Sequence, residues 1–118
     1  MEHGIAEGIL LFNTGNFFEA HEALETMRLK PTGHQKTLLH GLIQVAAAFD
    51  RHACGNPAGF RSPLAKGLRK LERFGAEAEG LHPAGLMLEL RSWREYLDRS
   101  SPRAFPAPPL PRIKRSRT

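Results

Sequence analysis

The segment from residue 34 to residue 53 is apolar around most of the circumference that it would have as an α-helix. A helix of this kind must be covered on nearly every side, so it constrains the fold more than any other part of the chain. We expect it to be the central and most buried element. Gly41 and the alanines at 46 to 48 would let neighbouring helices approach it closely. Its apolar residues include Leu38, Leu39, Leu42, Ile43, Val45, Ala46 and Phe49.

Apolar residues also recur at spacings of three and four in the rest of the chain, which is the period of an amphipathic helix. Gly15 and Gly55 are placed to end helices. Asn16 and Asn56 are placed to cap the helices that follow. Pro63 should interrupt any helix that runs through it. Because no segment has the alternation of a strand, the sequence predicts an all-α fold, a compact bundle of about five helices over residues 2–13, 16–28, 34–53, 63–74 and 83–100, with a short turn of helix at 57–61.

The chain after residue 101 has a different composition. Five of the nine prolines lie between residues 102 and 111, which excludes a regular helix and favours extended, polyproline-like chain. We therefore divide the chain into a helical domain, residues 1–101, and an extended Pro-rich C-terminal tail, residues 102–118. Phe105, Leu110 and Ile113 are the side chains expected to pin this tail to a surface groove. We expect residues 114–118 to be disordered.

The charged residues are unevenly distributed. The formal net charge is +5, but residues 1–102 contain twelve Lys/Arg and twelve Asp/Glu, so the basic excess belongs to the tail. The single cysteine, Cys54, excludes an internal disulfide and indicates a reducing, cytoplasmic setting. No apolar run approaches the roughly 20 residues that a membrane span needs, and the first residues do not have the basic start of a signal peptide. We therefore expect a cytoplasmic protein with no membrane partner.

The densest group of chemically active residues follows the turn at residues 13–15. His21 and Glu25 are one helical turn apart and Glu22 lies between them, so their side chains can converge on one point. Imidazole nitrogen and carboxylate oxygen suit a divalent metal such as zinc, iron or manganese. The sequence thus suggests that a metal ion or small ligand binds here. The predicted ligand-binding residues are Glu19, His21, Glu22, Glu25 and Gln44, and the predicted metal ligands are His21, Glu22 and Glu25, with Asp50 and His52 as further candidates.

A purely structural role accounts for the same residues. Glu22 and Glu25 can pair with basic groups across a helix interface, with His21 as a core histidine bonded to one of them. Buried carboxylates must be paired, and we favour this structural interpretation over the metal site. The chain has no nucleophile elbow, phosphate loop or Cys–His spacing, so the sequence favours binding over catalysis. The available basic partners are Arg28, Arg51, Arg91 and Arg94.

The chain contains three motifs, FNTGNFFEAHEALE at residues 12–25, GLIQVAA at 41–47 and GNPAG at 55–59. Together they resemble the domain-of-unknown-function family 309, a family of small helical proteins found widely in prokaryotes. The resemblance spans roughly residues 5 to 100 and implies a compact helical fold with no established activity. Members often have a histidine near the end of the central helix, where this chain has Asp50 with His52 close by. If that position belongs to a site, the resemblance implies that the site is altered or uses Asp50 instead.

Three functions remain open from the sequence. The first is binding of a metal or small ligand on the helix at residues 16–28. The second is a protein-interaction module that docks its Pro-rich tail, or the basic helix face from Lys66 to Arg73, on a protein partner or a second copy of the chain. The third is nucleic-acid binding through the basic residues from Arg112 to Arg117. We rank it last because no aromatic residues are interleaved with these basic ones.

Overall fold

The computed structural model describes residues 3–27, 33–56, 58–98 and 107–115. The described residues contain no strand, only two isolated bridges that involve Leu81. The predicted all-α bundle of about five helices is therefore confirmed. The helices are α1 (His3–Asn13), α2 (Phe17–Glu25), α3 (Gly33–Ala53), α4 (Ala58–Leu71) and α5 (Pro83–Asp98).

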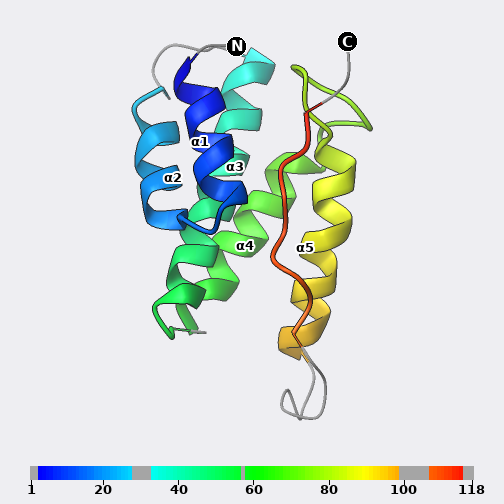
Figure 1. Ribbon diagram of the computed structural model, residues 1–118. Helices are drawn as coiled ribbons and strands as arrows, with labels where there is room; N and C mark the ends of the chain where they lie inside the picture. Colours follow the sequence, from blue (N-terminus) through cyan, green and yellow to red (C-terminus); the bar gives the residue numbers. More distant parts are fainter. Residues whose placement is uncertain (1–2, 28–32, 57, 99–106, 116–118) are drawn as a thin grey trace.

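Helix α3 is the centre of the bundle. It packs against both α2 and α4, while α1 packs on α2 and α5 packs on α4. Figure 1 shows α1 and α2 as neighbours on one side of the molecule and α5 on the other. As its apolar circumference predicts, α3 contributes more buried apolar side chains than any other described helix. None of the helices in the described residues is long and apolar enough to cross a bilayer.

The ring of Phe49 in α3 joins the other four helices. Its centroid lies 4.8 Å from Phe60 in α4, 5.2 Å from Trp93 in α5 and 5.5 Å from Phe17 in α2. The ring of Phe12 in α1 is 6.4 Å away. Three of these four pairs meet edge to face, the arrangement that the quadrupoles of aromatic rings favour. All five side chains are buried, so one aromatic cluster holds the helices together.

Helices α3 and α4 approach each other closely at two glycines. A Cβ atom on Gly67 would lie 2.7 Å from Val45 Cγ2 and 3.2 Å from the carbonyl oxygen of Gly41. A Cβ atom on Gly41 would in turn lie 3.2 Å from Leu71 Cδ2. The expected role of Gly41 in close approach is confirmed. The same role of Gly67 was not predicted, because the helical pattern of α4 rests on Leu64, Leu68 and Leu71 and does not involve this glycine.

Pro63 lies inside α4, so the predicted break before it is wrong. A proline in a helix interior costs about 3 kcal/mol, through a lost hydrogen bond and a clash one turn back. Phe60 and Leu64, on either side of Pro63, are both buried. Burying side chains of this size contributes about 1.5–3 kcal/mol each, which is enough to offset the proline. The expected short turn at 57–61 is therefore the first part of a continuous helix, apart from residue 57, which lies outside the described residues.

One of the two predicted asparagine caps forms. Asn56 accepts the backbone N–H of Gly59 on Oδ1 at 3.0 Å and so caps α4. Asn16 stands at the N-cap position of α2, but its side chain makes no cap hydrogen bond. Its Nδ2 donates instead to Thr14 Oγ1 at 2.9 Å, in the turn between α1 and α2. The first turn of α2 thus lacks the capping contact that the sequence suggested.

The contact between α3 and α4 predicts opposite effects for two glycine substitutions. Gly67→Ala should lower the free energy of unfolding by about 1–3 kcal/mol, because the new methyl group overpacks the interface. Gly85→Ala in α5 is the matched control, since the nearest atom to a Cβ added there would be His82 Cβ at 3.9 Å. It should raise stability by roughly 0.5–1 kcal/mol through helix propensity. Urea unfolding of both variants measures the difference, and equal effects would contradict the close approach.

Candidate functional site

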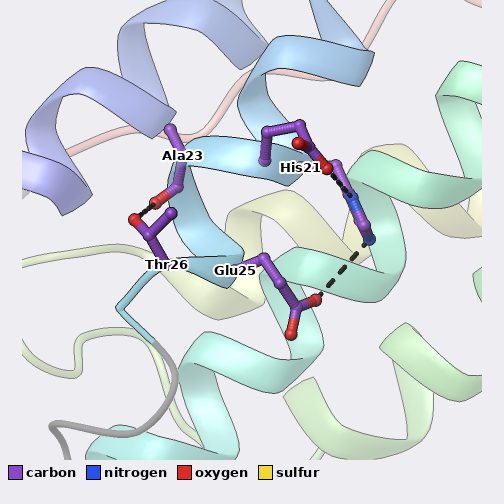
Figure 2. Close-up of polar contacts among 5 residues, drawn as sticks. His21, Ala23, Glu25 and Thr26 are labelled. Carbon is purple, nitrogen blue, oxygen red and sulfur yellow. Dashed lines mark hydrogen bonds and ion pairs between the residues drawn. The ribbon is translucent and has the colours of Figure 1, made fainter.

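The predicted metal ligands on α2 form a cluster at the surface. Figure 2 shows the His21 ring directed toward Glu25, with His21 Nε2 3.7 Å from Glu25 Oε2. His21 Nδ1 lies 3.9 Å from Glu22 Oε2. The side chains of His21, Glu25 and Glu22 are 30%, 35% and 62% exposed. This His21 cluster (His21, Glu22 and Glu25) is therefore half-exposed. The buried polar network of the structural interpretation is not found, because the described residues include no buried polar side chain.

The end of α2 is closed beside this cluster. Thr26 donates through Oγ1 to the carbonyl oxygen of Ala23 at 2.8 Å, and the bond is visible in Figure 2. It satisfies one of the carbonyl groups that a helix leaves unpaired at its C-terminal end. The last turn of α2, which carries Glu25, is thus fixed locally. Arg28, one of the expected partners of the carboxylates, lies outside the described residues.

The other predicted site residues have different surroundings. Glu19 is exposed on α2, and Gln44 is half-buried on α3. Asp50 accepts a weak hydrogen bond from Cys54 Sγ at 3.9 Å. The His52 ring packs 4.9 Å from Trp93 and 5.3 Å from Phe60, so it belongs to the edge of the aromatic cluster. Across the part of the chain that the structure describes, no three or more His, Cys, Asp or Glu residues form a group that could hold a metal ion.

A second site involves the tail, which the sequence predicted to be pinned to a surface groove without indicating where. It forms where residues 107–115, here called the C-terminal segment, run beside α5 and meet α1 (Figure 1). Asn13 at the end of α1 donates through Nδ2 to the carbonyl oxygen of Ile113 at 2.9 Å. The backbone N–H of Ile113 donates to Asn13 Oδ1 at 2.8 Å. One amide side chain therefore satisfies both backbone groups of a residue 100 positions away.

Helix α5 holds the backbone of the same segment. Trp93 Nε1 donates to the carbonyl oxygen of Pro109 at 3.0 Å. The backbone N–H of Arg112 donates to Glu89 Oε1 at 3.2 Å. The backbone N–H of His82, just before α5, donates to the carbonyl oxygen of Lys114 at 3.1 Å. Because prolines lack a backbone N–H, a Pro-rich segment has fewer hydrogen-bond donors that need partners when it docks.

Two side chains of the C-terminal segment enter the protein. Ile113 is only 3% exposed and belongs to the hydrophobic core, and Pro111 is also buried. Leu110, which was expected to pin the tail together with Ile113, is instead 49% exposed. Phe105, the third expected anchor, lies outside the described residues. The expectation of disorder from residue 114 is wrong for Lys114 and Arg115. The carbonyl oxygen of Lys114 accepts the backbone N–H of His82, and Arg115 forms an isolated bridge with Leu81.

Docking of the C-terminal segment creates an open groove beside α1, with a volume of about 720 Å³. On the α1 side it is lined by Ala6, Ile9 and Leu10. On the other side it is lined by Arg112, Lys114 and Arg115. We call this the α1 groove. Sequence patterns could not reveal this groove, because its two walls are about 100 residues apart in the chain. The side chain of Asn13 joins the walls through its two hydrogen bonds with Ile113.

The comparison with known families covers the α1 side of this second site, but not α5 or the C-terminal segment. Residues 5–62 match the family model described as Domain of unknown function (DUF309). The matched residues include Asn13 and the His21 cluster, whereas α5 and the C-terminal segment lie outside them. No curated protein matches the sequence of the chain.

The paired hydrogen bonds of Asn13 predict that this residue controls docking. Asn13→Ala should lower the free energy of unfolding by about 1–3 kcal/mol, because both backbone groups of Ile113 lose their partner. It should also speed hydrogen exchange of the Ile113 amide. Asn13→Asp keeps an oxygen that can accept the Ile113 N–H but loses the N–H donor to the Ile113 carbonyl group. It should therefore speed exchange of the Ile113 amide less than Asn13→Ala does.

Asn16→Ala is the matched control for these variants, because Asn16 is exposed and bonds only within its own turn. It should leave exchange of the Ile113 amide unchanged. The measurement is hydrogen exchange of single amides by NMR. Unchanged protection of Ile113 in Asn13→Ala would show that the segment is held without this residue.

Proposed function

Through residues 5–62 the chain belongs to the DUF309 family, and we propose that it is a protein-interaction module whose contact surface forms when the C-terminal segment docks on α1 and α5. The observation that carries this proposal is the reciprocal pair of hydrogen bonds between Asn13 and Ile113. These bonds fix the backbone of the segment. The side chains on either side of Ile113 are thereby placed at the surface beside α1.

The distribution of exposed apolar side chains supports this surface. Among the described residues, the large apolar side chains that remain exposed are Leu10, Phe18, Leu88 and Leu110. Three of these four belong to the elements that meet in docking, namely α1, α5 and the C-terminal segment. Leu10 lines the α1 groove, whereas Leu88 and Leu110 are not among its lining residues. Leu10 is therefore the exposed leucine that supports a contact surface at this groove, since isolated exposed leucines need no explanation.

The way the segment is held supports the same function. The bonds from Asn13, Trp93 and Glu89 all go to its backbone and not to its charged side chains. The side chains of Arg112, Lys114 and Arg115 are exposed. Charges at the rim of an interface speed association and select partners of opposite charge. Docking thus places three of the five basic residues that follow residue 102 on one side of a bundle with no net charge.

A second candidate function rests on the His21 cluster. Its imidazole has a carboxylate oxygen within 4 Å of each ring nitrogen, which is the convergence that the sequence predicted, although the described residues form no group of three or more that could hold a metal ion. The half-exposed geometry of the three side chains fits a surface ion pair equally well. Binding of a divalent metal by His21, Glu22 and Glu25, with Asp50 and His52 as further candidates, stays a prediction from the sequence. So does binding of a small ligand by Glu19, His21, Glu22, Glu25 and Gln44.

Site-specific crosslinking tests the interaction module. A photoreactive phenylalanine analogue in place of Leu10 should form covalent adducts with another polypeptide in cells that make the protein. The same analogue in place of Arg69, exposed on α4, is the control and should not. The adducts at position 10 should disappear when the chain is truncated after residue 106, and should weaken in Asn13→Ala. Adducts that form equally at both positions, or that persist without the C-terminal segment, would contradict the proposal.

Thermal unfolding separates the two interpretations of the His21 cluster. If His21 and Glu25 form only a surface pair, His21→Ala should lower the free energy of unfolding by less than about 1 kcal/mol, because solvent screens such pairs. Added Zn²⁺ should then leave the midpoint of unfolding unchanged. A rise in the midpoint with Zn²⁺ that both His21→Ala and Glu22→Ala abolish would establish the metal site instead.

A further inference from the structure

The α1 groove has one apolar wall. Ala6, Leu10 and Asn13 follow one another at helical spacings of four and three, so they line the same face of α1. Leu10 is 63% exposed on this face. No covalent or hydrogen-bonding chemistry is available from alanine and leucine side chains. This wall can therefore contribute to binding only by covering apolar groups of an occupant.

The opposite wall is cationic. Arg112, Lys114 and Arg115 all line the groove, and none of the described residues that line it is acidic. Glu89 lies close by, but its Oε1 accepts the backbone N–H of Arg112. Residues 1–102 have no net charge, so this wall carries most of the basic excess of the chain. An occupant that matches it must carry carboxylates or other anionic groups beside its apolar ones.

We propose that the α1 groove binds an acidic amphipathic segment of a partner protein, which covers Leu10 with apolar side chains and pairs its carboxylates with Arg112, Lys114 and Arg115. This inference rests on the proposed interaction function and names the chemistry of its partner. An amphipathic helix is the form of peptide that presents apolar side chains on one stripe and acidic ones beside it. The open shape and the volume of about 720 Å³ suit such a segment better than a small molecule, which binds in a more enclosed pocket.

Nucleic acid fits the groove less well than an acidic peptide. Single strands bind where aromatic side chains stack with the bases, and no Phe, Tyr or Trp is among the described residues that line this groove. The ring of His82 at the edge of the groove is held by contact between Nδ1 and the carbonyl oxygen of Ala76 at 3.1 Å. The cationic wall alone would attract any polyanion, so the apolar wall is the feature that selects a peptide.

A labelled synthetic peptide tests the proposal with the full-length protein. The probe is a fluorescein-tagged helix of about four turns, roughly 14 residues, built from Leu, Ala and Glu with the leucines at spacings of three and four. A scrambled peptide of the same composition and a version with Lys in place of Glu are the reference probes. Fluorescence anisotropy should show saturable binding of the first probe, about tenfold or more tighter than either reference.

Variants locate the binding in the α1 groove. Leu10→Gln and Arg112→Glu change exposed side chains, so they should leave the fold intact, and each should raise the dissociation constant about tenfold or more. Arg69→Glu, on the exposed face of α4, removes the same charge elsewhere and should change it less than about twofold. Circular dichroism of the variants should match that of the unchanged chain.

Several outcomes would overturn the proposal. One is equal binding of the acidic peptide and its Lys version, and another is an equal loss in Arg69→Glu and Arg112→Glu. Single-stranded RNA or vesicles of phosphatidylglycerol that bind through Leu10 and Arg112 more tightly than the peptide would also reject it. If the crosslinks from position 10 persist while the acidic peptide fails to bind, the partner chemistry is wrong and the interaction function stands. If those crosslinks are absent as well, both fail.

Discussion

The contact of the Phe49 ring with one aromatic ring from each other helix is the interaction on which the rest of the structure depends. Phe12, Phe17, Phe60 and Trp93 come from four separate helices, and their centroids all lie within 6.4 Å of Phe49. The described interior contains no polar side chain that is buried as a whole, so its packing depends mainly on apolar and aromatic contacts. The edge-to-face geometry of the rings supplies the specificity that a core of leucines alone would lack.

Trp93 connects this cluster to the C-terminal segment. Its indole ring packs against Phe49, while its Nε1 donates to the carbonyl oxygen of Pro109. Ile113, four residues further along, is buried in the same hydrophobic core and is held by Asn13. The position of the C-terminal segment therefore follows from the packing of the core. A surface that is held by contacts with the core presents its side chains more reproducibly than one built on an unsupported loop.

The fold was predicted from the sequence because it depends on periodicity. The apolar circumference of residues 34–53 identified the central helix, and the spacing of leucines identified the helices around it. The break predicted before Pro63 was wrong, because the burial of Phe60 and Leu64 outweighs the cost of a proline inside a helix. The α1 groove could not be predicted, since the partner of Asn13 lies 100 residues away in the chain and no period connects the two. The residues of the His21 cluster were predicted to converge, and the two contacts of His21 agree with that, whereas a metal at this point stays a prediction.

The separation of 100 residues between Asn13 and Ile113 also orders events during synthesis. Helices α1 to α4 and most of their aromatic contacts involve residues that leave the ribosome well before residue 113 does. Contacts so distant in the chain form late, because a long loop must close before they contribute any stability. A nascent chain therefore lacks the cationic wall beside α1 until translation has passed residue 115. The proposed surface is in this way restricted to molecules whose helical core has already had time to form.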